Sequence, residues 1–147
     1  MQRKLDADLP QVMADPESMR RALANLIDNA AEAMQGGLLR VLGVETCPSE
    51  DGADVEVVVS DTGPGLTDEI RERLFLPYYS TKHRGTGLGL SIAAKIVQEH
   101  GGSISAEPNS PKGARFVVRL PLMEPAGQDR TAAPAAADAE TVKEIVR

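Results

Sequence analysis

Aromatic side chains are scarce in this sequence of 147 residues. It has no Trp, two Phe and two Tyr, and aromatic residues make up 3% of the chain. A core built from this composition must be aliphatic, and the aromatic surfaces on which single-stranded nucleic acid stacks are not expected. Acidic residues outnumber basic ones by 22 to 16, and the net charge of −6 also disfavours binding to a phosphate backbone. We therefore expect no nucleic-acid partner.

Cysteine is scarce as well, and long apolar runs are absent. The single Cys47 has no partner for an intramolecular disulfide, and two His residues beside it do not make a zinc set. No apolar run approaches the roughly 20 residues that span a bilayer, and the polar segment Met1–Asp6 lacks the apolar stretch of a signal peptide. These absences predict a soluble, cytoplasmic chain with no membrane contact of its own. They leave open whether a longer parent protein is anchored in a membrane.

The rest of the composition is that of a globular domain. Hydrophobic residues make up 41% of the chain and charged residues 26%, and the length suits one domain. Pro and Ala dominate from Glu124 onward. We expect a folded domain over residues 1–122 and a flexible Ala/Pro-rich tail over residues 123–147, of which 139–147 can form a weak helix.

Two long helices are indicated by apolar residues at helical spacing. The first begins after Asp15, a helix-capping residue followed by Pro16, and extends to about residue 34. The second begins near Leu88 and ends at His100, which we expect to be a cation at the negative end of the helix dipole. A short helix follows the cap at Thr67.

The strands are expected in two adjacent pairs. The first pair comprises residues 38–46 and 54–60, and the second comprises residues 103–107 and 114–120. Helices fall between the pairs, so the pattern favours a two-layer α+β sandwich, with the helices on one face of one sheet, over an alternating parallel sheet.

Three polar segments are candidates for chemistry. Asn25 and Asn29 lie four residues apart on the first helix, where an amide oxygen suits Mg²⁺. Asp61 ends an apolar strand, and its carboxylate can accept a hydrogen bond from an adenine amine, while Gly63 and Gly65 let the backbone approach a flat base. The alternatives are polar residues on a half-exposed helix and a turn that closes a strand.

The third segment is the glycine-rich run Gly85–Gly89, which opens directly into the second long helix. Its backbone N–H groups and the positive helix end face the same point, as in an anion site. It lacks the Gly-Lys-Ser/Thr of a Walker A loop, and it does not match a dinucleotide fingerprint. Lys82 precedes it and favours phosphate contact, whereas His83 and Arg84 also fit a solvated loop.

Taken together and in this order, the segments resemble the nucleotide-binding catalytic domain of sensor histidine kinases. This domain belongs to a superfamily with gyrase, the Hsp90 chaperones and MutL. The resemblance covers residues 9–122. The segments that carry it are Asn25-Leu-Ile-Asp-Asn29-Ala30 (N box), Asp61-Thr-Gly-Pro-Gly65 (G1 box), Leu74-Phe75-Leu-Pro77 (F box) and Gly85-Thr-Gly-Leu-Gly-Leu90 (G2 box).

The resemblance implies a Bergerat-type ATP-binding fold with a mixed sheet, and a lid from Phe75 to Thr86 over bound ATP. It implies Asn29 as the ligand of Mg²⁺ and Asp61 as the acceptor for adenine. No residue is assigned as catalytic in its own right. The residues assigned to the nucleotide site are Asn25, Asn29, Ala33, Asp61, Gly63, Gly65, Lys82, Gly85, Thr86, Gly87, Leu88 and Gly89.

The phrases Phe75–Lys82 and Asn29–Met34 resemble most the nitrogen-regulation subfamily of these kinases. Other positions depart from the family pattern. Asn25 stands where hydrolytic members of the superfamily have a water-activating Glu, so we expect slow hydrolysis. Glu32 replaces a common Lys, and Gly113-Ala-Arg-Phe116 replaces the common Gly-Thr-Thr-Phe.

Neither His fits the family's phosphoacceptor, a His followed by an acidic residue, because Arg84 follows His83 and Gly101 follows His100. The resemblance therefore implies a fragment that binds Mg-ATP and transfers the γ-phosphate to a histidine on a separate dimerisation domain. A response regulator is the downstream partner, and we expect the fragment alone to be a monomer. The alternatives are a serine kinase of the anti-sigma type, a protein-recognition module of the same fold that no longer binds nucleotide, and a hydrolytic ATPase.

Overall fold

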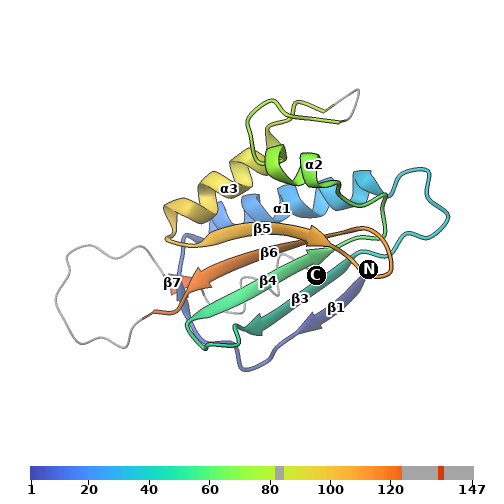
Figure 1. Cartoon of the computed structure of the whole chain (residues 1–147). Helices are drawn as coiled ribbons and strands as arrows, with labels where there is room; N and C mark the ends of the chain where they lie inside the picture. Colours follow the sequence, from blue (N-terminus) through green and yellow to red (C-terminus); the bar gives the residue numbers. More distant parts are fainter. Residues whose placement is uncertain (82–84, 124–135, 138–147) are drawn as a thin grey trace.

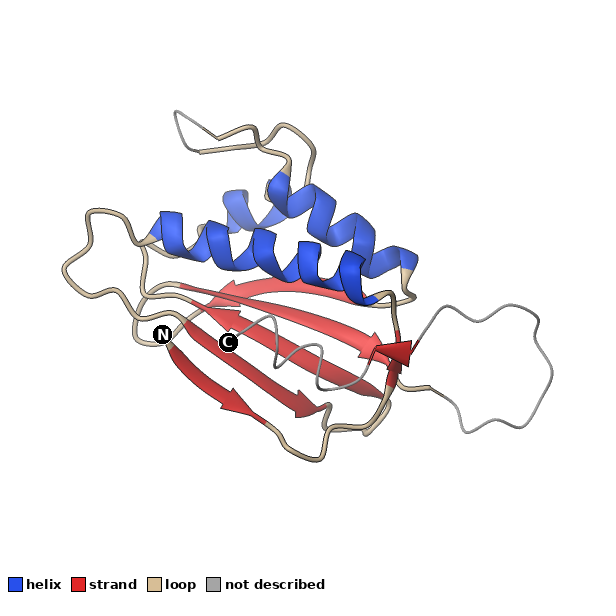
Figure 2. Ribbon diagram, turned by 180° about the vertical axis from the view of Figure 1, so that it is seen from behind, coloured by secondary structure: helices blue, strands red, loops and turns tan. Residues whose placement is uncertain are grey.

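The computed structural model describes residues 1–81, 85–123 and 136–137. A layer of helices covers one face of a five-stranded sheet (Figure 1, Figure 2). The predicted two-layer α+β architecture with a mixed sheet is therefore confirmed. No helix in the described part of the chain has the length and apolar character needed to cross a membrane.

The sheet has the strand order β1-β3-β4-β6-β5, and its neighbours are antiparallel except for the parallel pair β1 and β3. The bounds are β1 Gln2–Leu5, β3 Gly43–Pro48, β4 Asp54–Ser60, β5 Ser103–Pro108 and β6 Ala114–Pro121. Both predicted hairpins are present, as β3–β4 and β5–β6. The central contact between β4 and β6 joins the two hairpins into one sheet.

The helical layer consists of α1 (Pro16–Ala33), α2 (Asp68–Arg73) and α3 (Gly89–Glu99). All three predicted helices are confirmed, including the caps at Asp15 and Thr67. The core lies between α1, α3 and the inner face of the sheet, and it is aliphatic apart from Phe116. Each of its buried residues adds about 25 cal/mol per Å² of apolar surface removed from water.

The predicted strand over residues 38–46 begins later than expected, at Gly43. Residues 38–42 form a loop whose backbone bonds to a side chain rather than along a strand. The N–H of Val41 donates to Oγ1 of Thr62, and this hydroxyl donates to the carbonyl of Leu39. Thr62 therefore takes the place of a strand neighbour, and Leu38 and Leu39 lie exposed.

Three strands were not anticipated. β1 is polar and almost entirely exposed, so it has no apolar alternation to reveal it, and its first N–H donates to the carbonyl of Leu42. The short β2 (Val12–Met13) pairs antiparallel with β7 (Ala136–Ala137), which lies within the region expected to be a flexible tail. Two-residue strands carry no periodicity. The predicted weak helix over 139–147 lies outside the described residues.

His100 lies at the end of α3, as expected. Its Nε2 accepts a hydrogen bond from the backbone N–H of Asp15 at 3.0 Å. Its Nδ1 lies 2.6 Å from the carbonyl oxygen of Ile96. The imidazole therefore links the end of α3 to the cap that starts α1.

We expect Asp15→Ala to lower the melting temperature at neutral pH. The Asp15 carboxylate accepts from the N–H of Ser18 at 2.8 Å, and hydrogen bonding from Ser18 holds the pKa of Asp15 below its ordinary value. A lowered pKa in the folded state gives a stabilisation that is full above the unfolded pKa of about 3.9 and is lost as the pH falls through the lower, folded pKa.

Melting curves between pH 7 and pH 2.5 check this prediction, with Asp15→Asn as the matched control. Asn caps a helix about as well as Asp but does not titrate. The difference in melting temperature between the parent and the Ala variant should shrink toward pH 2.5, while the difference in melting temperature between the Asn and Ala variants stays the same. If both differences were independent of pH, the charge of Asp15 would have no role in the stabilisation.

Candidate nucleotide-binding site

The Asp61 carboxylate lies at the end of β4, and only 1% of the residue is exposed. Its Oδ1 accepts from the N–H of Gly63 at 2.8 Å and from the N–H of Ala114 at 3.2 Å. Its Oδ2 is buried and has no hydrogen-bond partner among the described residues. A buried acceptor without a partner costs free energy, and a ligand that donates a hydrogen bond removes that cost.

Asp61 lines a cavity of about 860 Å³, a size typical of small-molecule sites. The walls come from α1, the segment after β4, α2, the segment before α3, and β6. The lining residues include Asn25, Asp28, Asn29, Glu32, Ala33, Asp61, Pro64, Gly65, Leu66, Thr67, Ile70, Leu74, Tyr79, Ser80, Thr81, Gly85, Thr86, Gly87, Gly89, Leu90, Ala114 and Phe116. We refer to it below as the main cavity.

The α1 wall is formed by residues that recur every fourth position. Asn25, Asn29 and Ala33 share one face of the helix and all line the main cavity. Asn25 lies beside the start of α3, because a Cβ added to Gly89 would be 3.3 Å from its Oδ1. At the other end of α1, a Cβ added to Gly63 would be 2.9 Å from the carbonyl oxygen of Ala33. The helix therefore runs along the cavity from α3 to the Asp61 loop.

The start of α3 has no side-chain cap. Leu88 occupies the cap position without a side-chain hydrogen bond, and Gly89 is the first helical residue. The first N–H groups of a helix have no partner within the helix, and the dipole is positive there, so this end favours an anion. Gly89 lines the main cavity. Leu88 does not, although its carbonyl accepts from Ser91 and so holds the first turn.

The glycine-rich segment is packed against the F-box segment by direct backbone contact. Gly87 has a φ of 68°, and a Cβ there would lie 2.6 Å from the carbonyl carbon of Tyr78. The N–H of Tyr78 donates to the carbonyl of Gly87 at 2.9 Å. Only glycine fits this contact, so Gly87 fixes the segment that contributes Gly85 and Thr86 to the cavity wall.

Most of the residues predicted for the nucleotide site line the main cavity. These are Asn25, Asn29, Ala33, Asp61, Gly65, Gly85, Thr86, Gly87 and Gly89. Gly63 and Leu88 lie next to it and hold its walls, through the bond to Asp61 and the first turn of α3. Lys82 lies outside the described residues, as do His83 and Arg84.

The apolar part of the wall was not identified from the sequence. Leu66, Ile70 and Leu74 recur every fourth residue, with Ile70 in α2 and the other two just beyond its ends, and Phe116 is added from β6. The helical spacing of these residues could have indicated the apolar wall, although the same spacing is typical of a helix face that packs in the core. Ala114 lines the cavity. A guanidinium nitrogen of Arg115 lies 3.8 Å from a carboxylate oxygen of Glu107.

No cluster of three or more His, Cys, Asp or Glu side chains suited to a metal ion occurs among the described residues. Asn29, the residue predicted to hold Mg²⁺, lines the main cavity. An amide oxygen is a hard ligand of the kind that Mg²⁺ prefers, together with substrate phosphates and water.

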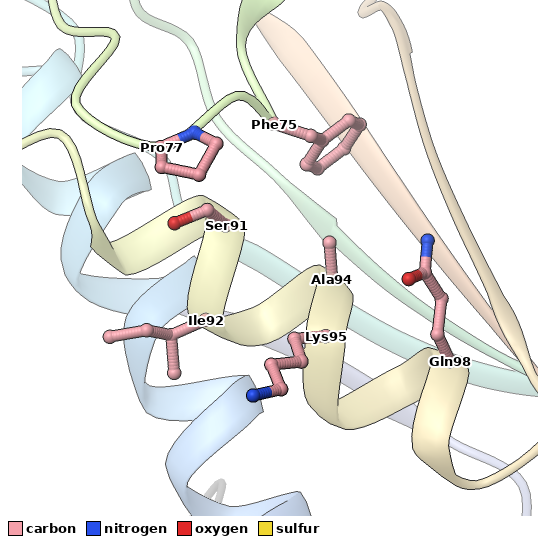
Figure 3. A pocket seen from close by; sticks show the side chains of 7 residues that line it. All are labelled: Phe75, Pro77, Ser91, Ile92, Ala94, Lys95 and Gln98. Carbon is pink, nitrogen blue, oxygen red and sulfur yellow. The ribbon is translucent and has the colours of Figure 1, made fainter.

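A second, smaller cavity of about 280 Å³ lies between the F-box segment and α3 (Figure 3). Phe75 and Pro77 face the helix there, and α3 contributes residues such as Lys95 and Gln98. Phe75 also packs edge-on against Phe116, with ring centroids 6.5 Å apart. None of the predicted nucleotide-site residues that the structure describes lines this cavity. The F box thus borders a separate cavity, and it contributes to the wall of the main cavity through Leu74 and through the contact of Phe75 with Phe116.

Comparison of the chain with known proteins identifies one matching family and several similar histidine kinases. Residues 14–124 match the family described as "Histidine kinase-, DNA gyrase B-, and HSP90-like ATPase". The chain is 42% identical over 115 residues to the sensor histidine kinase ZraS of Escherichia coli O157:H7, a match that covers 78% of this chain and 24% of ZraS. The chain thus spans about a quarter of the length of this relative.

Two solved histidine kinases are similar in structure. The catalytic domain of ThkA in a nucleotide-free form has a TM-score of 0.70 at 35% identity, covering 82% of this chain and 76% of that domain. ThkA has also been solved in complex with the response regulator protein TrrA. Full-length ShkA in complex with AMPPNP has a TM-score of 0.70 at 28% identity, covering 86% of this chain and 26% of ShkA.

We expect Gly113→Ala to destabilise the fold by about 3 kcal/mol or more. Gly113 has a φ of 113°, and a Cβ there would collide with the backbone carbonyl of Asp61 and lie 2.9 Å from Cα of Thr62. Relief of this collision must move the segment that holds the Asp61 carboxylate.

Gly52→Ala is the matched control. Gly52 also has a positive φ, of 70°, but a Cβ there would meet nothing within 4 Å. We expect only the backbone penalty of about 1–2 kcal/mol. Urea unfolding of both variants measures the difference, and equal destabilisation would show that the contact with Asp61 is not tight.

Proposed function

Because the chain belongs to the family of histidine kinase-, DNA gyrase B- and HSP90-like ATPases, we propose that it is the ATP-binding catalytic domain of a two-component sensor histidine kinase. The proposal rests on the buried Oδ2 of Asp61, which has no hydrogen-bond partner within the described parts of the chain and lies in a cavity of suitable size. An adenine amino group supplies the donor that this oxygen lacks. The complex of the similar kinase ShkA with AMPPNP supports ATP as the ligand.

The phosphates belong at the other side of the cavity. The uncapped start of α3 and the backbone of Gly85–Gly89 offer N–H groups and a positive dipole end. We propose Asn29 as the protein ligand of Mg²⁺, which neutralises phosphate charge when it is bound. Asn25 has no carboxylate with which to activate water, so bound ATP is preserved for transfer rather than hydrolysed.

The proposed reaction is transfer of the γ-phosphate to a histidine on a separate dimerisation domain of the parent kinase. A response regulator then accepts the phosphate, a pairing supported by the ThkA complex with TrrA. The contribution of this chain is positioning and charge neutralisation, because phosphoryl transfer asks for little covalent chemistry from the protein. Closure of a lid over residues 75–86 stays a prediction, because part of that segment lies outside the described residues.

Finer assignments remain proposals that rest on the sequence. The nitrogen-regulation subfamily rests on the phrases Phe75–Lys82 and Asn29–Met34 alone, and the similar kinases named above do not support it. The division into a domain over residues 1–122 and a tail rests on composition, and the β2–β7 pair attaches two tail residues to the domain. The cytoplasmic location rests on the scarcity of cysteine and of apolar runs.

We expect Asp61→Asn to lower the affinity for ATP at least about tenfold, since a hydrogen bond to a charged group is worth about 1.5–3 kcal/mol. Asn retains an acceptor for Gly63 and Ala114 but replaces the free oxygen by a donor. Calorimetric titration with ATP and GTP, with and without Mg²⁺, measures the effect.

Asp54→Asn is the control for this titration, since it removes a carboxylate from the opposite end of the same strand. Wild-type binding should prefer ATP to GTP and should strengthen with Mg²⁺. Equal ATP affinity in both variants would refute the adenine role of Asp61. Absence of any binding at millimolar ATP would favour the protein-recognition module.

Mixing the chain with Mg-ATP and the dimerisation domain of a similar kinase such as ZraS should label a histidine with phosphate. Asn29→Ala should reduce this labelling at least about tenfold, because the metal loses its protein ligand. Radiolabelled γ-phosphate and acid treatment identify the product, since phosphohistidine is lost in acid. An acid-stable phosphoserine would favour the anti-sigma-type serine kinase, and ATP turnover without any acceptor would favour a hydrolytic ATPase.

A further inference from the structure

Tyr79 is an aromatic side chain of the main cavity to which the sequence motifs assign no role. It is half-buried and lines the cavity, whereas its neighbour Tyr78 is 79% exposed and does not. Phe116, the other aromatic residue in the described wall, is 1% exposed and belongs to the core. Tyr79 is therefore the aromatic ring of the described wall that remains available to a ligand.

The Tyr79 ring is held by a cation from α2. The guanidinium carbon of Arg73 lies over the ring, 5.5 Å from its centroid, which is the geometry of a cation–π contact. Arg73 is itself positioned by Glu69, whose carboxylate lies 3.7 Å from a guanidinium nitrogen. The ring thus has a fixed partner on a helix that also supplies Ile70 to the cavity.

The backbone at Tyr79 is fixed as well. Its N–H donates to the carbonyl of Leu76, and the preceding N–H donates to the carbonyl of Gly87. A Cβ added to Gly87 would lie 2.9 Å from the nitrogen of Tyr79, so this backbone and the glycine segment are in direct contact. A side chain anchored in this way is ordered before a ligand arrives, which lowers the entropy lost on binding.

Tyr79 lies along the chain between the apolar wall of the main cavity and its contact with the glycine segment. The chain enters the segment from Leu74, in the apolar wall, and is bonded at Tyr78 to Gly87, in the glycine segment. In a nucleotide with its base at Asp61 and its phosphates at the glycine segment, the nucleoside lies in the part of the cavity that Tyr79 lines.

We propose that Tyr79 stacks against the nucleoside part of bound ATP and that Arg73 is the positioning residue that holds its ring. This inference rests on the proposed function and names a determinant of affinity within the same site. The ring supplies the apolar surface, and the guanidinium covering it keeps the ring from turning out of the cavity.

Tyrosine fluorescence tests the contact directly, because the chain has no Trp and only two Tyr. In Tyr78→Phe the emission comes from Tyr79 alone, and saturating ATP should quench it. In Tyr79→Phe the emission comes from Tyr78 alone and should stay constant. Quenching confined to Tyr78, or absent from both variants while calorimetry shows ATP bound, would overturn the proposal.

Affinity gives the second readout. Tyr79→Leu should weaken binding of ATP and of ADP about tenfold, the size expected for loss of one stacking contact. Tyr79→Phe should bind within about twofold of wild type, since it keeps the ring. Tyr78→Leu is the matched control and should also leave the affinity unchanged. Inorganic tripolyphosphate, which lacks a nucleoside, should bind Tyr79→Leu and wild type alike.

Arg73→Gln tests the positioning role, with Arg71→Gln as its control. Arg71 lies on the same helix and pairs with Asp68, but it does not cover the ring. Arg73→Gln should weaken ATP binding about threefold, less than loss of the ring itself, and should reduce the ATP-induced quenching of Tyr79 in the Tyr78→Phe background. Equal effects of the two Arg variants would overturn the positioning role.

The outcomes separate this inference from the function on which it rests. Failure of wild type to bind ATP would refute the proposed function. ATP binding that depends on Asp61 but is unchanged in Tyr79→Leu would refute the stacking contact alone.

Discussion

The Asp61 carboxylate is the interaction on which the site depends. One of its oxygens accepts from the N–H groups of Gly63 and Ala114, and so it joins the segment after β4 to the start of β6. The backbone carbonyl of Asp61 also accepts from the side-chain amide of Asn109, in the turn between β5 and β6. These bonds fix the first oxygen, and they hold the second oxygen in place without a hydrogen-bond partner among the residues that the structure describes.

Close backbone packing around this carboxylate explains why glycine recurs in the motifs. Gly63 lies against the end of α1, and Gly113 lies against the carbonyl of Asp61. Side chains at these positions would separate the elements whose approach forms the cavity. The glycines therefore shape the site by allowing its walls to approach closely, in addition to any contact of their own with a ligand.

The sequence predicted the elements that have strong local signals. The helix caps at Asp15 and Thr67, the apolar stripes and the β-branched run Asp54–Ser60 each specify their element, and all are found. The motif residues converge on one cavity, because the N box lies on α1 and the G2 box at the start of α3, which pack against each other.

The features that were missed depend on tertiary contacts. β1 is an exposed edge strand that exists through its pairing with β3. The loop after α1 follows from two hydrogen bonds to Thr62, a residue far along the chain. His100 accepts a hydrogen bond from a backbone N–H at the start of α1, which no local pattern reveals. Tyr79 was one of several residues in an irregular segment until the structure placed Arg73 over its ring.

The bond between Asp15 and His100 has a consequence for how the cavity can change shape. It joins the start of α1 to the end of α3, while Asn25 and Gly89 meet near the opposite end of α3. The two helices are thus joined by a hydrogen bond at one end of α3 and lie against each other again at Asn25, near the other end. Both contacts oppose separation of the walls that carry Asn29 and the start of α3, so the width of the cavity depends in part on a hydrogen bond that lies outside it.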